Sequence, residues 1–470
     1  MTLAVSLAPA PDPFGTCVRL SGAGLPYLLF LDSSAQGALG HFSFLCADPV
    51  ALIRAPNSVD PLEAARELLA PYAREPIPGL PPFQGGVAGY LGYDWGAELE
   101  RVQRPVERSS RLTPDVVLGL YDWVIAWDHL EEKAWIISTG INPEAGGPKQ
   151  ENERAAARLA WVQHQLARAT PAITEHSKPT PAPPQPNFTR AEFESGVRRI
   201  RDYIAAGDVY QVNFAQRFQA AFTGVPLALY RRLRARNPAP FGAYLDYDGT
   251  VVASISPERF LRVAAGSRIV EARPIKGTRP RGSTPAKDTA LARALQASAK
   301  DRAENVMIVD LLRNDLGKVC RTGSVEVPRL LALESHPTVH HLVSTVTGVL
   351  RDDADAFDLI RAAFPGGSVT GAPKIRAMEI IAELERGPRG VYCGAIGYVS
   401  VTGAMDLNIP IRTIVLRGGE ASFHAGAGIV WDSEPAAEYQ ETLAKARTMI
   451  EALTSPRRMP RIRGRAHPLA

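Results

Sequence analysis

A proline-rich stretch divides this chain of 470 residues into two unequal parts. Residues 171–186 contain six prolines and show no periodic apolar pattern. Proline fixes φ and lacks a backbone N–H, so such a stretch favours an exposed connector over a helix or a central strand. We therefore expect an N-terminal region over residues 1–170, a linker over 171–187, a second region over 188–455 and a basic tail over 456–470.

Both parts mix strand-like and helix-like patterns, and an α/β (α+β) fold is the prediction. Thr189 and Glu192 form a capping box ahead of a run whose apolar positions recur at helical spacing. Residues 208–218 are expected to be a strand beside a hairpin built from 242–247 and 251–255.

Several functional classes are disfavoured by composition. The four cysteines form no C-x-x-C pair, so a zinc site or disulfide framework is not expected and a reducing, cytoplasmic location is the default. The N-terminus lacks the charged region of a signal peptide, and no apolar run approaches the length of a membrane span. A net charge of +4 does not imply nucleic acid, and the basic tail is more simply a solvated end.

One lysine is held in a restricted segment. Between residues 271 and 278, Pro274 and Gly277 bracket an Ile-Lys pair and so place the amine of Lys276, while Glu258 lies a short distance upstream. A placed amine followed by Gly-Thr suggests a nucleophile beside backbone N–H groups that could meet an anion. Taken alone, the same stretch also fits a surface lysine in a β-turn.

Two predicted helices carry acidic residues three positions apart, Asp301 with Glu304 and Glu438 with Glu441. This spacing places both carboxylates of a pair on one helix face. If the two faces meet, they form an oxygen-rich site suited to Mg²⁺. The alternative is two ordinary solvated faces.

Other segments could hold an anionic or polar ligand. The segment 365–371 is expected to open a helix whose N–H groups favour an anion, although a simple glycine turn is an even alternative. Arg412 lies within the predicted strand 407–416, where it either extends to solvent or meets a carboxylate. His341 could be a general acid or base, or a structural histidine. Together with Lys276 and the acidic pairs, these groups suit a small substrate with several carboxylates.

Five segments together resemble the chorismate-utilising enzymes, namely residues 274–278, 301–315, 364–374, 426–430 and 438–442. The resemblance is dense from about residue 189 to 455 and weaker in 30–33, 41–43 and 83–94. It implies one large α/β unit with two stacked β-sheets and helices outside.

Two positions choose among activities within this family. Members that add water carry a lysine where this chain has Gln211, so the resemblance favours an ammonia user. Among ammonia users, anthranilate synthases carry alanine where this chain has Lys276. The lysine implies conversion of chorismate and ammonia to 4-amino-4-deoxychorismate, for 4-aminobenzoate and folate biosynthesis. An anthranilate synthase, with Lys276 as a bystander, and a non-catalytic chorismate-binding regulator are the alternatives.

The resemblance also implies roles for individual residues. Lys276 would attack C2 of chorismate, Glu258 would act as acid and base at the departing hydroxyl, and His341 would assist. The residues implied in substrate binding are Gly277, Thr278, Tyr392, Arg412, Gly426, Ala427 and Gly428. Those implied in binding Mg²⁺ are Glu304 and Glu441, with Glu438 and Asp301 behind them.

Family members can also bind tryptophan in the N-terminal half, and the matching positions here are Ser33, residues 39–42, Pro240, Phe241 and Gly242. Asp32 departs from the glutamate of feedback-regulated members, which puts inhibition in doubt. No Gly-x-Cys-x-Gly nucleophile motif surrounds any cysteine. Ammonia is therefore expected from a separate glutamine amidotransferase subunit.

Overall fold

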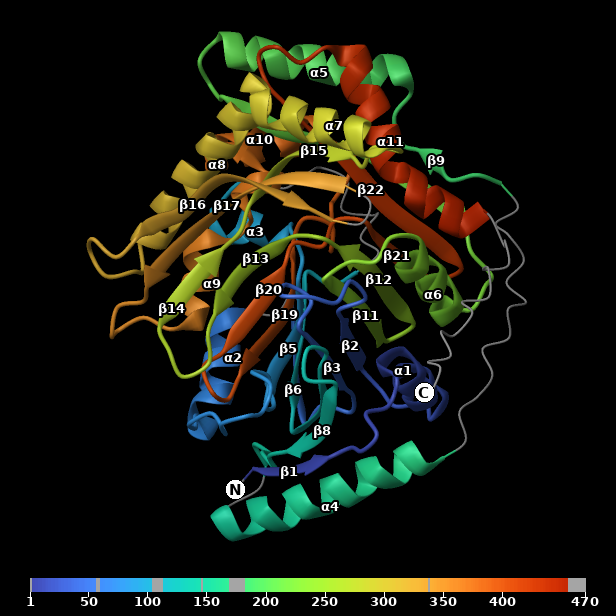
Figure 1. Cartoon of the computed structure of the whole chain (residues 1–470), viewed down its shortest axis with the longest axis vertical. Coiled ribbons are helices and arrows are strands. Elements are labelled where there is room, and N and C mark those ends of the chain that lie inside the picture. Colours follow the sequence, from blue (N-terminus) through green and yellow to red (C-terminus); the bar gives the residue numbers. More distant parts are fainter. Residues whose placement is uncertain are drawn as a thin grey trace.

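The structure, a computed structural model, describes residues 2–55, 60–103, 113–144, 147–168, 182–336 and 339–454. Most of the predicted linker and all of the predicted basic tail lie outside these ranges. Within them, two large antiparallel sheets are surrounded by helices (Figure 1). The expected α/β fold with two sheets and outer helices is confirmed.

Each sheet contains strands from both sides of the proline-rich stretch. In spatial order, the first sheet consists of β1 (Leu3–Ser6), β8 (Lys133–Ser138), β7 (Trp123–Asp128), β3 (Phe42–Cys46), β2 (Leu28–Asp32), β11 (Phe241–Tyr247), β12 (Thr250–Ser256), β21 (Thr413–Arg417), β22 (Glu420–Ile429), β10 (Gln211–Ala221) and β18 (Gly371–Ala372), with β9 (Gln185–Pro186) beside β10. The second consists of β15 (Ile275–Pro280), β17 (Val339–Val349), β14 (Ile269–Ala272), β13 (Arg259–Val263), β20 (Met405–Asn408), β19 (Ala395–Ser400), β5 (Gly86–Leu91), β6 (Val116–Tyr121) and β4 (Ala51–Ala55), with β16 (Glu326–Ser335) beside β17.

The sheets are joined by an apolar core that both contribute to. Phe44 and Val252 from the first sheet belong to one buried cluster with Tyr90 and Tyr398 from the second. β5, β6 and β12 are buried along their whole length and carry no charged residue, as expected of strands covered on both faces.

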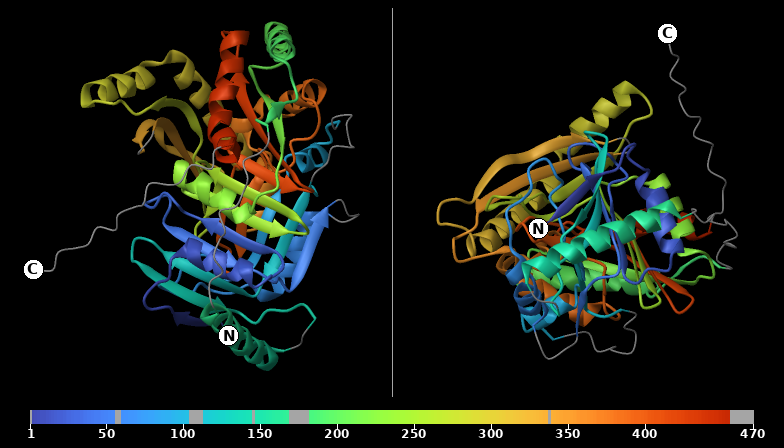
Figure 2. Two further views of the ribbon diagram at one scale, coloured as in Figure 1. Left: turned by 90° about the vertical axis from the view of Figure 1, so that its right-hand side faces the viewer. Right: turned by 90° about the horizontal axis from the view of Figure 1, so that it is seen from below.

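Helices cover the outer faces of the sheets. They are α1 (Pro13–Gly22), α2 (Pro61–Leu69), α3 (Trp95–Leu99), α4 (Pro148–Ala167), α5 (Arg190–Ala205), α6 (Pro226–Arg236), α7 (Pro285–Ala297), α8 (Ala299–Gly317), α9 (Ala356–Ala363), α10 (Lys374–Leu384) and α11 (Pro435–Thr454), with 3₁₀ turns at η1 (Ala70–Tyr72) and η3 (Gly367–Val369). The rotated views place α4 at one end of the molecule and α5 at the other (Figure 2). Among the described helices, none is long and apolar enough to cross a membrane.

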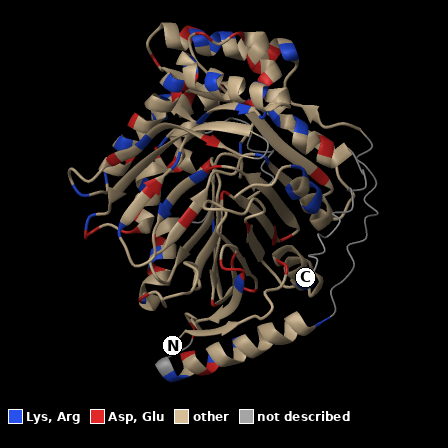
Figure 3. Ribbon diagram, in the orientation of Figure 1, with Lys and Arg blue, Asp and Glu red and all other residues tan. Residues whose placement is uncertain are grey.

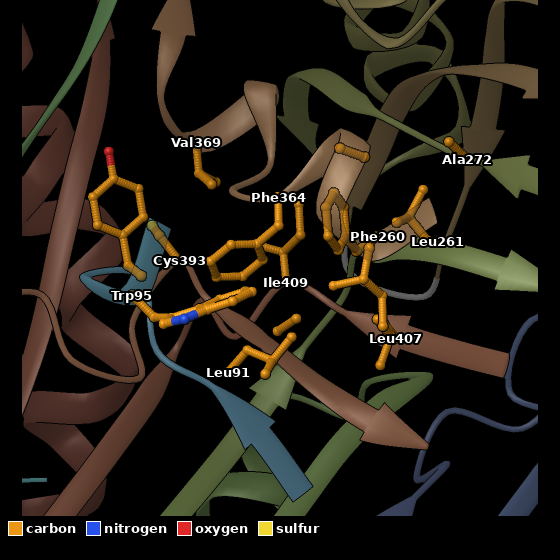
Figure 4. Packing of buried hydrophobic residues seen from close by; sticks show 14 of the residues in the cluster. Leu91, Trp95, Phe260, Leu261, Ala272, Phe364, Val369, Cys393, Leu407 and Ile409 are labelled. Atoms are coloured by element: carbon orange, nitrogen blue, oxygen red, sulfur yellow. The ribbon is translucent and has the colours of Figure 1, made fainter. Parts of the chain in front are cut away.

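A second apolar cluster lies under α2, α5, α8, α9 and α10. In it, Trp95 of α3 and Phe260 of β13 pack on either side of Phe364, with ring centroids 5.4 and 6.4 Å from it (Figure 4). Phe364 immediately precedes the glycine segment 365–371. This packing therefore fixes the position of the glycine segment 365–371.

The structure corrects two predictions of local pairing. The strand predicted at 208–218 does form, but β10 pairs with β22, two hundred residues away in sequence, and not with the hairpin of β11 and β12. The predicted strand 407–416 is two strands, because the chain leaves β20 in one sheet, passes Pro410 and enters β21 in the other. The capping box at Thr189 and Glu192 is confirmed at the start of α5.

Gly89 in β5 offers a test of sheet packing. A Cβ there would lie 2.0 Å from the Val117 carbonyl oxygen, and the residue has φ +152°. We expect Gly89→Ala to lower the free energy of unfolding by about 3 kcal/mol or more, because backbone cannot move away cheaply. Gly249→Ala is the control: φ is +70° but nothing lies near the added methyl, so a loss of about 1 kcal/mol is expected. Equal losses in denaturant unfolding would contradict the clash.

Candidate active site

Lys276 lies on β15, at the edge of the second sheet and beside α7 and α8. Its Nζ donates a hydrogen bond to the carbonyl oxygen of Ser368 at 2.6 Å. Burial lowers the pKa of Lys276, while the nearby carboxylates of Glu304 and Glu258 oppose the change. The following Gly277 has φ +81°, and a Cβ there would lie 2.9 Å from Leu295 and Asp301, so no larger residue fits this turn of the strand.

Glu258 lies just beyond the end of β12 and is 5% exposed. Its Oε1 accepts a hydrogen bond from Ser368 Oγ at 2.9 Å, and its backbone N–H donates to Ser256 Oγ. Burial raises the pKa of Glu258, and the positive charge of Lys276 lowers it only in part. A buried carboxyl with a raised pKa can hold a proton closer to neutral pH than an exposed one.

Ser368 therefore connects the two groups, and no role for it was predicted from the sequence. Its carbonyl accepts from Lys276 and its hydroxyl donates to Glu258. The segment 365–371 does precede a helix, α10 from Lys374, but it contains η3 and the first residue of β18 before that helix begins. The segment offers a carbonyl oxygen to the amine of Lys276, which agrees with the glycine turn, one of the two alternatives predicted for it, more than with N–H groups facing an anion.

His341 lies on β17, which pairs with β15, the strand that carries Lys276. Its Nδ1 is 2.9 Å from Thr278 Oγ1, so the structure brings together these two predicted site residues. Burial, and then the positive charges of His336 and Arg412, lower the pKa of His341 to about 3. The imidazole is therefore neutral at physiological pH and can exchange hydrogen bonds without carrying charge.

Arg412 occupies the crossover between the sheets, which corrects its predicted place within a strand. It has φ +53°, a left-handed conformation that is uncommon outside glycine. Desolvation lowers the pKa of Arg412. Within the described ranges of the chain, its guanidinium has no hydrogen bond or ion pair. A desolvated, unpaired guanidinium is suited to a planar carboxylate.

The predicted substrate cradle is formed by a pair of neighbouring strands. Gly426, Ala427 and Gly428 lie on β22 opposite Ala215, Phe214 and Asn213 of β10. A Cβ on Gly428 would lie 2.5 Å from the amide nitrogen of Gln211, and one on Gly426 would lie 2.8 Å from Asn213 Oδ1. Among the described atoms, both polar atoms of the Gln211 amide are buried without a partner. Such a surface can meet a polar ligand.

Tyr392 lies in the loop before β19 and contacts the strand β22 that carries the cradle glycines. Its ring stacks on His424 of β22, with ring centroids 5.1 Å apart and planes 13° apart. The guanidinium of Arg389 lies 5.8 Å from the same ring. The tyrosine is therefore fixed from two sides, as a residue that orients a ligand must be.

The three predicted metal ligands lie on two helices: Glu304 on α8, which packs on β17 of the second sheet, and Glu438 and Glu441 on α11, which packs on β22 of the first. Figure 3 marks the positions of the charged residues along the ribbon, many of them on the outer helices. Glu438 is buried, and its Oε2 has no hydrogen-bond partner among the described atoms. Burial raises the pKa of Glu304. For Glu441, burial would raise the pKa, but Lys445 at 2.8 Å brings it below its ordinary value.

These carboxylates are of the type that a hard cation prefers, but they do not form a closely grouped set of three. Among the described residues, no three or more Asp, Glu, His or Cys side chains are grouped closely enough to ligate an ion. Asp301, expected behind the ligands, pairs instead with Arg279 at 2.9 Å. The buried, unpartnered Glu438 Oε2 is the observation that favours a cation, because Mg²⁺ prefers few carboxylates and several waters.

A separate cavity of about 90 Å³ lies away from Lys276, and the predicted tryptophan-binding positions surround it. Its walls include Ser33, Leu39, His41, Phe42, Pro240, Phe241 and Gly242. Ser33 Oγ donates to the Phe42 and Pro240 carbonyl oxygens, and Asp32 pairs with Arg234 at 2.8 Å. The structure brings these residues together, and their ligand stays a prediction.

The sequence pattern of one family, described as chorismate binding enzyme, matches residues 27–451. This chain belongs to the chorismate binding enzymes. It is 42% identical over 446 residues to aminodeoxychorismate synthase component 1 from Salmonella typhimurium, covering 91% of this chain and 93% of that protein. It is 41% identical over 452 residues to anthranilate synthase component 1 from Streptomyces coelicolor, covering 94% and 86%.

The fold of this chorismate binding enzyme is also that of a solved relative. The crystal structure of anthranilate synthase component I from Streptococcus pneumoniae aligns with a TM-score of 0.77 and 36% identity, covering 88% of this chain and 93% of that one. Relatives with both activities are thus similar along most of their length. The choice between them has to come from individual site residues.

The lowered pKa of Lys276 can be measured directly. Cyanate carbamylates neutral amines, so we expect the pH midpoint for labelling of Lys276 to lie below that of Lys287, which is exposed on α7. Peptide mass spectrometry after brief labelling between pH 6 and 11 reports both sites in one sample. A midpoint for Lys276 at or above that of Lys287 would contradict the electrostatic description.

Proposed function

We propose that this chain converts chorismate and ammonia to 4-amino-4-deoxychorismate, and that it pairs with a glutamine amidotransferase that supplies the ammonia from glutamine. The observation that carries the proposal is Lys276: a buried amine on the Ser368 carbonyl, in the same hydrogen-bonded group as Glu258. A regulator that only binds chorismate needs no such nucleophile. The relative from Salmonella typhimurium is named a component 1, which supports a second component.

Lys276 and Glu258 can divide the first half of the reaction between them. Neutral Lys276 attacks C2 of chorismate, the ring double bonds shift, and the C4–O bond breaks. Glu258, when protonated, donates its proton so that the hydroxyl leaves as water. The proton lost by the new secondary amine can return to the Glu258 carboxylate.

In the second half of the reaction, ammonia adds at C4 and Lys276 leaves from C2. Its nitrogen bonds to C4, the double bonds shift back, and the bond between Lys276 and C2 breaks. A proton moves from the incoming nitrogen to the lysine as it leaves. The balance is chorismate and ammonia in, 4-amino-4-deoxychorismate and water out, so the enzyme transfers an amide nitrogen when glutamine is the source.

Other residues would hold the substrate in place. Arg412, unpaired and desolvated, is available for a carboxylate. Gly426 and Gly428 leave room for backbone to approach the ring, and Tyr392 bounds it on one side. His341, neutral and bonded to Thr278, would hydrogen-bond to the departing hydroxyl or hold Thr278 for the substrate.

Glu304, Glu438 and Glu441 would hold Mg²⁺. When bound, the ion would supply positive charge that favours an anionic substrate. With the ion bound, the negative charges of the three carboxylates would repel an anionic substrate less.

Anthranilate synthesis is the second candidate, because a relative with that name is 41% identical over most of the chain. In that reaction Lys276 would have no chemical step. Burying the Lys276 amine would then lower stability and serve no step of the reaction. Its hydrogen bond to Ser368 therefore favours the first candidate.

The two candidates give different products. We expect the protein with chorismate, Mg²⁺ and ammonium at alkaline pH, followed by an aminodeoxychorismate lyase, to yield 4-aminobenzoate. Lys276→Ala should lower that yield by about 10³-fold or more, because it removes the nucleophile. Lys287→Ala is the matched control and should keep full activity. Fluorescent anthranilate without 4-aminobenzoate would reject the assignment, and full activity of Lys276→Ala would reject the covalent step alone.

Removal of Mg²⁺ tests the acidic residues. Treatment with EDTA should lower 4-aminobenzoate formation by at least about 10²-fold, and added Mg²⁺ should restore it. Glu438→Gln should need more Mg²⁺ for half-maximal activity, since the amide is a weaker ligand. Full activity in EDTA would mean that these carboxylates do not act through a metal.

A further inference from the structure

Lys300, at the start of α8, lies between the two acidic helices. Its Nζ is 3.3 Å from Glu438 Oε1 on α11 and 4.0 Å from Glu304 Oε1 on its own helix. The two carboxylates are 5% and 14% exposed, whereas the lysine side chain is 44% exposed. One flexible, half-exposed cation therefore bridges two of the three carboxylates that would hold Mg²⁺.

The bridge does not satisfy the site completely. Glu438 Oε1 accepts from Lys300 and from Ser433 Oγ, but Glu438 Oε2 is buried with no partner among the described atoms. Glu441 is held separately by Lys445. Lys276 also acts on Glu304 through its charge, so the three carboxylates share three ammonium groups. Glu438 Oε2 nevertheless stays buried without a hydrogen-bond partner among the described atoms, which leaves room for one more cation.

We infer that Lys300 is the resident counter-ion of this site: it holds Glu304 and Glu438 together when Mg²⁺ is absent and moves out to solvent when Mg²⁺ binds. The inference rests on the metal site proposed above. A lysine suits this role because its charge sits on a long flexible stem with no planar, two-point geometry to break. Its exposed end means that little packing is lost on leaving.

This competition predicts opposite effects on stability and on affinity. Without Lys300, the metal-free protein keeps two buried carboxylates with no bridging cation and should be less stable. The same loss should favour Mg²⁺ binding, because no ion pair has to be broken first. An ordinary surface ion pair would show neither the gain in affinity nor the dependence of stability on Mg²⁺.

The test compares Lys300→Met with Arg302→Met. Arg302 lies two residues further along α8, beside Val306 on an open apolar groove, so its loss changes the net charge equally without touching the carboxylates. Calorimetric titration of the EDTA-treated, dialysed full chain with MgCl₂ gives affinity. Thermal midpoints in EDTA and in saturating MgCl₂ give stability.

We expect Lys300→Met to bind Mg²⁺ about fivefold more tightly than the wild type, the size expected for an ion pair at a half-exposed position. Its midpoint should fall in EDTA and recover in MgCl₂, while Arg302→Met follows the wild type in both. Lys300→Arg, which keeps the charge, should not gain affinity. If Lys300→Met does not fold, Lys300→Gln serves in its place.

Unchanged or weaker Mg²⁺ binding by Lys300→Met, beside a wild type that binds, would overturn this inference alone. A similar gain in Arg302→Met would also overturn it, because the effect would then follow net charge. A wild type that shows no Mg²⁺ binding would overturn both this inference and the metal part of the proposed function. The readouts do not depend on turnover of chorismate.

Discussion

The buried ion pair between Arg389 and Glu385 is the interaction on which the site depends. The two side chains are 2% and 5% exposed, and Arg389 donates to both oxygens of Glu385, at 2.9 and 2.6 Å. Its remaining N–H groups donate to the carbonyl oxygens of Val369 and Asn213. A buried charge is tolerated only when its donors are satisfied, and breaking such a pair costs about 3–5 kcal/mol. The segments that satisfy Arg389 are therefore held firmly.

Those segments carry the candidate chemistry. Val369 is the neighbour of Ser368, which bonds both Lys276 and Glu258. Asn213 lies on β10 opposite Gly428, and Glu385 accepts from the backbone of Ala215 on the same strand. Arg389 also lies 5.8 Å from the ring of Tyr392. One cation thus links the lysine, the cradle and the tyrosine, which come from segments far apart in sequence.

The sequence predicted correctly those features that depend on residues close together in the chain. The capping box at Thr189 and Glu192 begins α5 because both partners lie within one turn. The pairing of β10 with β22 was missed, because the register is set by contacts two hundred residues apart. Arg412 was placed in a strand for the same reason: the apolar residues around it fit a strand, but two sheets compete for them. Sequence motifs indicated Lys276, Glu258 and Arg412 as site residues. Ser368 was missed because one of its two contacts is made by the backbone carbonyl, which every residue has.

Burial explains why a lysine and a glutamate are paired at the centre of this site. Desolvation lowers the pKa of Lys276 and raises that of Glu258, and the opposite charge of each partner resists the change. An ion pair and a pair of neutral groups contain the same number of protons, so burial shifts the balance toward the neutral pair. A neutral amine and a protonated carboxyl are the two reagents that the proposed first step requires. Removing negative charge near Lys276 shifts the balance further toward the neutral amine, so a cation bound at Glu304 in the proposed metal site would act on the nucleophile as well.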